Sequence, residues 1–467
     1  MMMSEEELEK KKYERMTSGN IKKLVSLLAV PTIISMLITN LYNMADSFFV
    51  GQLKDSSQTG AISVVLSLMS IIQAIGFFFG HGSGNFMSRE LGKKNHENAS
   101  KMAATGLVIA FLFGLVLAIL GLFLLKPFAR ILGSTETILP YAMDYMKYIL
   151  IATPFMTSSF VLNNQLRFQG SARNAMIGIA SGAILNIILD ALLIQRMGIS
   201  GAGLATAISQ ILSFFILFSM TFIKGNIRIQ LKKVQWKWHY LWEIFRGGFP
   251  SVCRQGIASI ASICLTIAAK KYAGDFDPDD VISAVGIVAR IMNFGNAIII
   301  GFNQGYQPVC AYNYGAGKKR RVREAFWFTL WVGEAMGVIL GTLFILFSPQ
   351  LIQLFADMEK QKAVIDLGAK ALRIQATVFP LIVFINISNM SMQAMAKVVR
   401  ASLLAAARQW LCFIPLLFLL PIFWGLDGIL YAQAIADGFT FLISLPFTYF
   451  LLRELKQDVP HNVEYEK

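Results

Sequence analysis

The chain contains little charge, few cysteines and few histidines. Only 15% of its 467 residues are charged whereas 55% are hydrophobic, a balance that excludes an ordinary soluble protein. The four histidines lie far apart and no HExxH motif is present, so the sequence offers no familiar catalytic or zinc-binding pattern. We therefore expect a protein that is not an enzyme and needs no cofactor. All four cysteines lie in apolar segments and suit small core residues rather than disulfides or a metal site: Cys253, Cys264, Cys310 and Cys412.

The sequence is instead rich in long hydrophobic segments. About 20 apolar residues in a helix cross the roughly 30 Å hydrocarbon core of a membrane. The sequence contains twelve such segments, six in each half. It therefore predicts an all-α integral membrane protein with twelve transmembrane helices in two pseudo-symmetric six-helix lobes. The expected spans are 24–50, 60–86, 102–125, 139–165, 174–197, 201–223, 249–273, 281–311, 325–347, 366–395, 401–423 and 428–452.

The positive charge is distributed unevenly between the two sides of these spans. The formal net charge is +14, and most of the 42 Lys and Arg residues fall in alternate loops and in the two terminal segments. Cytoplasmic loops of membrane proteins carry this excess of basic residues, so both termini are expected in the cytoplasm. The basic surplus then reflects topology and contact with membrane lipids. A nucleic-acid partner is not expected.

The spans divide the chain into two lobes joined by a basic linker. Trp residues interleaved with Lys and Arg in this linker, Trp236, Trp238 and Trp242, suit a segment at the cytoplasmic membrane interface. The terminal segment 1–23 is expected to hold a frayed or surface helix. The predicted divisions are 1–23 (cytoplasmic segment), 24–223 (N-lobe), 224–248 (interfacial linker), 249–452 (C-lobe) and 453–467 (cytoplasmic tail).

The two halves share a pattern of glycines and lysines. Gly76, Gly80 and Gly92 return about 225 positions later as Gly301, Gly305 and Gly317, and Gly198 and Gly201 return as Gly425 and Gly428. Two hydrophobic halves with one pattern are typical of secondary transporters, which handle their substrate where the repeats meet. The repeat therefore predicts transport.

Carboxylates inside membrane spans are costly and usually functional. Asp46 and Asp190 lie deep in apolar sequence of the first half. Each shares a helix face with a polar residue four positions earlier, Tyr42 and Asn186 respectively. The second half has leucines at about the equivalent positions, which predicts that the first half carries out the ion chemistry.

Further polar residues can complete this site. Tyr145, Asn163 and Thr206 can point into the same interior, and the alternative for a lone Asn or Thr is a structural hydrogen bond between helices. Oxygen ligands suit H⁺ or a hard cation such as Na⁺, so a possible Na⁺ site consists of Asp46, Asn186, Asp190 and Thr206. Pro31 removes a backbone hydrogen bond and marks a candidate bend in the first span.

Other ionisable residues in the spans are expected to have different roles. Asp144 lies near the outer interface, where a structural and a functional role remain equally open. Glu334 and Asp437 are expected to pair with arginines or other cations as structural elements. His81 is expected to be a packing or interface residue.

Several motifs resemble the MATE family of multidrug and toxin extrusion transporters, and bacterial multidrug exporters in particular. Pro31 followed by "MADSFFVGQL" around Asp46 is similar to the family's first-helix signature. "NIILDALLI" at 186–194 resembles its fifth-helix signature, and "MSRELGKKNHENA" resembles its first inside loop. "QAMAK" and "YAQAIAD" resemble patterns of its second half.

This resemblance implies a protein of the bacterial cell membrane that exports organic cations in exchange for H⁺ or Na⁺, acting as a monomer. It carries the family's N-lobe cluster onto Tyr42, Asp46, Tyr145, Asn163, Asn186, Asp190 and Thr206. The alternative is a flippase for a lipid-linked saccharide or another amphipathic metabolite. Such a protein would line its cavity with cations, for which Arg254, Arg290 and Arg373 are the candidates.

Overall fold

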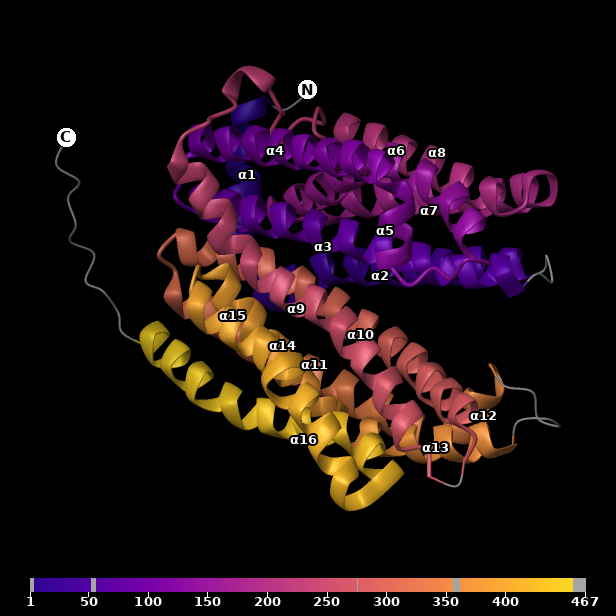
Figure 1. Cartoon of the computed structure of the whole chain (residues 1–467). Helices are drawn as coiled ribbons and strands as arrows, with labels where there is room; N and C mark the ends of the chain where they lie inside the picture. Colours follow the sequence, from indigo (N-terminus) through magenta and orange to yellow (C-terminus); the bar gives the residue numbers. More distant parts are fainter. Residues whose placement is uncertain (1–3, 52–55, 275, 356–361, 457–467) are drawn as a thin grey trace.

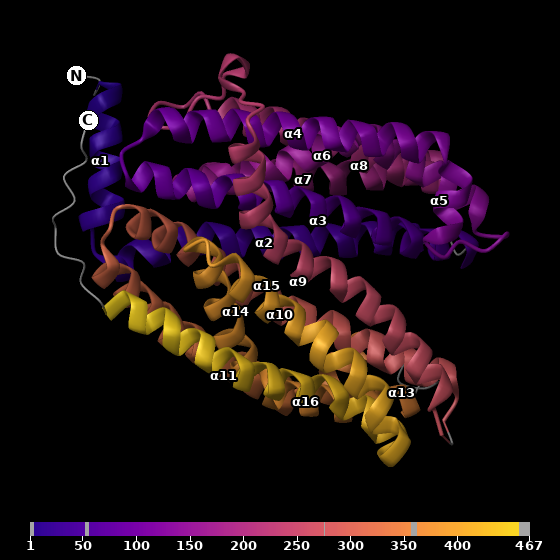
Figure 2. The ribbon, with the colours of Figure 1, turned by 60° about the vertical axis from the view of Figure 1, so that its left-hand side comes forward.

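Helices make up every regular element in residues 4–51, 56–274, 276–355 and 362–456, the part of the chain that the computed structural model describes (Figure 1). These helices form two bundles, one from each half of the sequence. The bundles lie close together at the end where α1 (Glu5–Ser18) is found and diverge toward the opposite end (Figure 2). The first is called the α1 end below, and the second the open end.

The first bundle contains six long helices and the short helix α5 near the open end. In chain order they are α2 (Ile21–Gly51), α3 (Ser56–Gly92), α4 (His96–Phe123), α5 (Leu125–Ile131), α6 (Leu139–Phe168), α7 (Ala172–Met197) and α8 (Ile199–Met220). A connection containing the 3₁₀ turn η1 (Leu231–Lys233) leads to the second bundle.

The second bundle repeats this arrangement with more interruptions. Its helices are α9 (Trp238–Lys271), α10 (Pro278–Gly315), α11 (Lys319–Leu346), α12 (Ser348–Gln353), α13 (Lys362–Thr377), α14 (Phe379–Ala394), α15 (Val398–Ala406), the π-helical turn η2 (Ala407–Phe413) and α16 (Ile414–Lys456).

The helices account for the twelve expected spans. Within the described ranges, eight helices are long and apolar enough to cross a membrane, or nine when the bent pair α13–α14 counts as one span. The last of them, Val398–Lys456, holds two expected spans because the chain reverses at Gly425. The remaining two are the long helices α6 and α9, which carry more polar side chains.

The glycine repeat of the sequence has a structural counterpart. Gly198 and Gly425 occupy equivalent reversals in the two bundles, with φ of 59° and 53°. An L-residue is strained there, whereas glycine is not. Gly201 and Gly428 follow, and a Cβ on either would lie within 2.5 Å of backbone in the preceding helix. The two halves therefore fold to one local plan.

The bundles contact each other through the first two helices of each half, α2 against α10 and α3 against α9. Glycines bring these backbones together. A Cβ on Gly305 of α10 would lie 2.3 Å from Ala29 Cα of α2, and one on Gly248 of α9 would lie 2.1 Å from the Phe78 carbonyl oxygen of α3. We name these contacts the glycine seam.

Most helix boundaries differ from the expected spans by a few residues, and two differences are larger. α9 begins at Trp238 rather than at residue 249, so part of the expected linker is helical. The expected span 366–395 is two helices, α13 and α14, which meet at Val378 with a bend of 50°. Pro380 lies in the first turn of α14, where its missing N–H breaks no helical bond.

Candidate functional site

Asp46 of α2 and Tyr145 of α6 meet inside the first bundle. The Tyr145 hydroxyl donates to Asp46 Oδ2 at 2.6 Å, and both side chains are buried. Tyr42, one turn before Asp46, is also buried in this region. A carboxylate in an apolar interior requires such donors because its hydration has been removed.

A second polar group lies next to this pair. Asn186 Nδ2 donates to Asp190 Oδ1 at 3.4 Å on α7 and to Thr206 Oγ1 of α8 at 3.3 Å. All three side chains are at most 2% exposed. Helix α8 packs directly on Tyr145, because a Cβ on Gly203, one turn before Thr206, would lie 2.9 Å from Tyr145 Cδ2. The structure thus brings together six of the predicted residues: Tyr42, Asp46, Tyr145, Asn186, Asp190 and Thr206. We name these six the polar cluster.

The polar cluster contains acceptor oxygens that have no donor. Asp46 Oδ1, Asn186 Oδ1 and Asp190 Oδ2 are buried and make no hydrogen bond. Buried polar atoms are normally satisfied, so this cluster has unused acceptor capacity. The described residues contain no group of three or more His, Cys, Asp and Glu side chains that could hold a metal. Carboxylate, amide and hydroxyl oxygens are ligands that a hard cation accepts.

Two predicted site residues lie away from the polar cluster. Asn163 follows Tyr145 by about five turns of α6, or about 27 Å, and its Nδ2 donates to the Ala175 carbonyl at 3.2 Å. It joins α6 to α7 instead of contacting the cluster. Pro31 lies inside α2, which runs unbroken from Ile21 to Gly51, about 22 Å along the helix from Asp46.

The remaining acids have different surroundings. Asp144 is about half exposed and pairs with Lys147 at 2.6 Å. Asp437 is buried and pairs with Arg408 at 2.7 Å, in agreement with a structural role. Glu334 is partly buried, and the described residues provide no ion pair for it, contrary to the expected pairing.

His81 is fully buried where the bundles meet, as expected for an interface residue. Its Nδ1 contacts Ser251 Oγ of α9 at 3.1 Å, and its ring stacks on Phe77 with centroids 5.1 Å apart. Gln393 Nε2 also donates to Ser251 Oγ, at 2.8 Å, so α14 joins the same network. Polar side chains therefore link the bundles beside the glycine seam.

Sequence reasoning missed Arg167, which also joins the two bundles. It lies in the last turn of α6 and is 2% exposed, yet it follows a predicted span and was therefore expected in the cytoplasmic loop. Its Nη1 donates to Gln304 of α10 in the other bundle. The sequence signal was that polar residues begin at Asn163, inside the predicted span 139–165.

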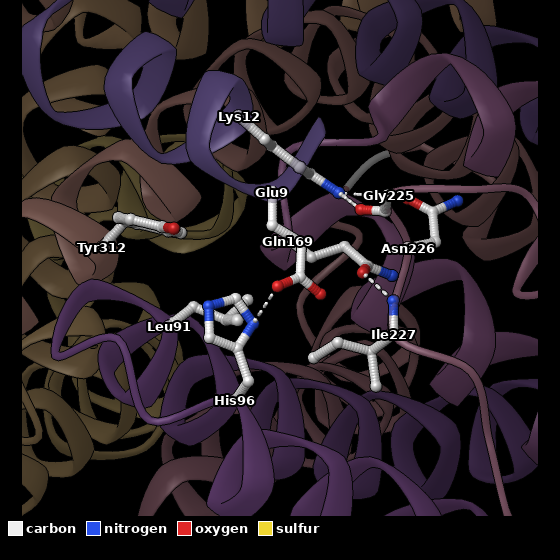
Figure 3. A pocket seen from close by; sticks show the side chains of 9 residues that line it. All are labelled: Glu9, Lys12, Leu91, His96, Gln169, Gly225, Asn226, Ile227 and Tyr312. Atoms are coloured by element: carbon white, nitrogen blue, oxygen red, sulfur yellow. Dashed lines mark hydrogen bonds and ion pairs between the residues drawn. The ribbon is translucent and has the colours of Figure 1, made fainter. Parts of the chain in front are cut away.

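A pocket at the α1 end lies between α1, loops and helix ends of the first bundle, and Tyr312 of α10 (Figure 3). Lys12 Nζ donates to the Gly225 carbonyl at 2.8 Å, to Asn226 Oδ1 at 3.0 Å and to Ser171 Oγ at 3.1 Å. Burial among these groups, together with the nearby charge of Arg15, lowers the pKa of Lys12 to about 7. From the opposite bundle, Asn313 Nδ2 donates to the Met16 carbonyl at 3.0 Å. Helix α1 is therefore fastened to both bundles.

Comparisons with known proteins agree with this architecture. The chain is 27% identical over 443 residues to the multidrug export protein MepA of Staphylococcus saprophyticus, covering 92% of this chain and 94% of the relative. It is 27% identical over 454 residues to MepA of Staphylococcus haemolyticus, covering 96% and 98%.

Solved structures share the fold. A multidrug resistance MATE family transporter of the MOP superfamily in an outward-facing conformation superposes with a TM-score of 0.88, at 22% identity over 95% of this chain and 98% of that one. A MOP superfamily transporter from Pyrococcus furiosus gives the same TM-score, identity and coverage. The MatE family model matches residues 31–192 and 256–419, in both halves. The chain therefore belongs to the MATE family of membrane transporters, which are not enzymes.

Proposed function

We propose that this protein is a secondary antiporter that exports organic cations and drugs from a bacterial cell, taking up H⁺ or Na⁺ in exchange. The polar cluster carries this proposal, because buried oxygens on Asp46, Asn186 and Asp190 lack donors inside the first bundle. The similarity to multidrug export proteins supports drugs as the substrates. The protein would act as a monomer in the cell membrane, with the α1 end in the cytoplasm.

The coupling follows from the charges of the cluster. Two carboxylates in a region without water repel each other unless a proton or a cation compensates them. Binding of that ion would draw α2, α7 and α8 together around Asp46 and Asp190, and Pro31 offers a point where α2 can bend. If the ion-loaded packing binds drug less well, drug binding weakens ion binding by the same factor.

The two bundles would then move relative to each other, so that the space between them opens first to one side of the membrane and then to the other. They are in contact at the α1 end and apart at the open end (Figure 2), which matches an outward-facing state when the α1 end is cytoplasmic. Parting of the glycine seam would open the cytoplasmic side. Aromatic and Met side chains suit varied organic cations because they offer cation–π contacts and adaptable surfaces.

The test is ethidium efflux from proteoliposomes driven by an imposed pH gradient or an imposed Na⁺ gradient. We expect one gradient to drive efflux, and Asp46→Asn and Asp190→Asn each to slow it at least about tenfold, since a carboxylate–cation interaction is worth more than about 1.4 kcal/mol. Asp144→Asn is the control, because its carboxylate is half exposed and paired with Lys147. If the wild type responds to neither gradient, drug antiport is wrong, and transport of a lipid-linked saccharide becomes the function to test.

A further inference from the structure

Two arginines at the contact between the bundles lack carboxylate partners. Other inward-facing arginines are paired, as in Arg89–Glu243 at 3.2 Å and Arg408–Asp437 at 2.7 Å. Arg167 of α6 and Arg254 of α9 have no ion pair with any described acid, and the hydrogen bonds that they donate go to amide side chains. Uncompensated charge inside a membrane protein is costly and generally serves function.

In this structure both guanidinium groups donate hydrogen bonds to neutral amide side chains. Arg167 Nη2 donates to Asn164 Oδ1 at 2.5 Å, its Nη1 donates to Gln304, and its buried Nε has no partner. Arg254 Nη1 donates to Asn389 Oδ1 at 3.2 Å. A guanidinium has five N–H donors, so both arginines can take a further acceptor or exchange an amide for an anion, which forms stronger bonds.

The two arginines belong to one region although they come from opposite bundles. His81 lies between them, because its Nδ1 contacts Ser251 Oγ of α9, one turn before Arg254, and its ring meets the ring of Phe168, the residue after Arg167. His81 Nε2 and Arg167 Nε are buried without a partner. The region thus combines two cations with polar groups that still need partners.

Aromatic rings lie next to these charges. Phe77 stacks on His81, and the Phe168 ring meets the His81 ring edge-on with centroids 6.0 Å apart. An aromatic molecule with an acidic group would therefore find both an apolar surface and a cationic partner here. The region lies about six turns of α6, or about 33 Å, from Tyr145 of the polar cluster, so one small molecule cannot occupy both.

We propose that Arg167 and Arg254 form an anion-binding subsite for the carboxylate of an aromatic substrate. The subsite would open when the bundles part, because the Arg167–Gln304 bond crosses between them. This inference builds on the proposed export of organic cations and extends it to zwitterions whose carboxylate binds between the two guanidinium groups. The planar fork of arginine matches a carboxylate in geometry as well as in charge.

The test compares two dyes that differ only in this group. Rhodamine 110 has a free carboxylate and rhodamine 123 is its methyl ester, so both share one cationic ring system. Fluorescence anisotropy with protein in phosphatidylcholine nanodiscs gives Kd for each dye. We expect Arg254→Gln to raise Kd for rhodamine 110 at least about tenfold, as for loss of a hydrogen-bonded charge pair, and to change Kd for rhodamine 123 less than about twofold.

Control variants separate binding from folding. Arg254→Lys should recover part of the affinity for rhodamine 110, and Arg290→Gln should change neither dye because Arg290 is exposed on α10. Arg167→Gln should repeat the Arg254→Gln result if the variant remains folded. Equal weakening of both dyes by Arg254→Gln, or no weakening of rhodamine 110, would overturn the proposal.

Anionic lipid tests the other source of an anion. The wild type should bind rhodamine 110 with a lower Kd than rhodamine 123. If nanodiscs containing phosphatidylglycerol abolish this difference in Kd, a lipid phosphate binds the two arginines and the substrate assignment is wrong. An unchanged difference supports the assignment. Failure of the proposed export would be recognised separately, as absence of rhodamine 123 efflux under both a pH and a Na⁺ gradient.

Discussion

The Tyr145 hydroxyl is the single group that donates to Asp46 in the polar cluster among the described residues. In the proposed antiport it would compete with the coupling ion for this carboxylate, because both provide positive charge to its oxygens. The proposal therefore predicts that this hydrogen bond weakens binding of the ion.

We predict that Tyr145→Phe retains the fold and lowers the half-saturating concentration of the coupling ion about tenfold. A hydrogen bond to a charged group is worth about 1.5–3 kcal/mol, and its loss leaves a carboxylate that attracts a cation more strongly. Proteoliposome efflux at graded H⁺ or Na⁺ concentrations measures this change. Tyr141→Phe is the matched control, since Tyr141 lies one turn away on α6 and outside the cluster. An unchanged or raised half-saturating concentration would show that the hydroxyl does not compete with the ion.

At the scale of single residues, the sequence predicted the centre of the site but not its full membership. Asp46 and Asp190 were found because a carboxylate in an apolar span is conspicuous. Asn163 was included as a polar span residue that could point into the same interior and by the family resemblance, but about five turns of α6 separate it from Tyr145. Arg167 was missed because a basic residue after a predicted span is ordinarily assigned to the loop. Contacts across the bundle interface depend on tertiary packing that helix spacing does not encode.

Helix α10 shows how the packing of an element depends on where its glycines lie. Gly305 contacts the α2 backbone in the glycine seam, whereas nothing lies within 4 Å of a Cβ placed on Gly286 of the same helix. An added methyl group therefore clashes with α2 at Gly305 and meets open space at Gly286.

We predict that Gly305→Ala weakens the closed contact at the α1 end. The added methyl would lie 2.3 Å from Ala29 Cα, and such overpacking costs about 1–3 kcal/mol unless the helices move apart. Electron paramagnetic resonance distances between labels at Lys93→Cys and Arg320→Cys, in a background without native cysteines, should become longer in nanodiscs. Gly286→Ala should leave them unchanged. Identical distances in both variants would mean that the seam does not hold the bundles together.

At the scale of elements, long spans and their repeat were predictable, and interruptions were less so. Gly198 and Gly425 appear as matched reversals because the same turn geometry requires glycine in each half. The early start of α9 was hidden because Trp and basic residues are compatible with both an interfacial linker and a helix. The break between α13 and α14 at Val378 lies just before Pro380, whereas the equivalent Pro154 lies inside the continuous helix α6. A proline in the sequence therefore does not by itself predict a break.

The whole molecule is held at the α1 end by one terminal helix as well as by the glycine seam. Lys12 of α1 bonds to loops of the first bundle, and Lys318 of the second bundle donates to the Thr17 carbonyl at 2.9 Å. When the bundles part, α1 must lose its hydrogen bonds either to the first bundle or to the second. The equilibrium between open and closed forms therefore includes the free energy of docking α1.

The protonation of Lys12 makes this docking depend on pH. Docked Lys12 has its pKa lowered to about 7 from an ordinary value of 10.5, so between these values the undocked state binds more protons. Docking is therefore weakest below about pH 7 and strengthens as pH rises toward 10.5.

We predict that the docked fraction of α1 rises between pH 6.5 and 9, as Lys12 loses its proton in the docked state. Distances from a label at Lys10→Cys to labels at Lys232→Cys and Arg320→Cys report docking to each bundle. Lys12→Met should remove the pH dependence because it keeps the chain length without the charge, whereas Lys11→Met, at an exposed neighbour, should preserve it. A docked fraction that falls with pH, or one that responds equally in Lys12→Met, would contradict this account. Because docking joins both bundles, the same rise in pH should lengthen the lifetime of the form closed at the α1 end, and Lys12→Met should make that lifetime independent of pH.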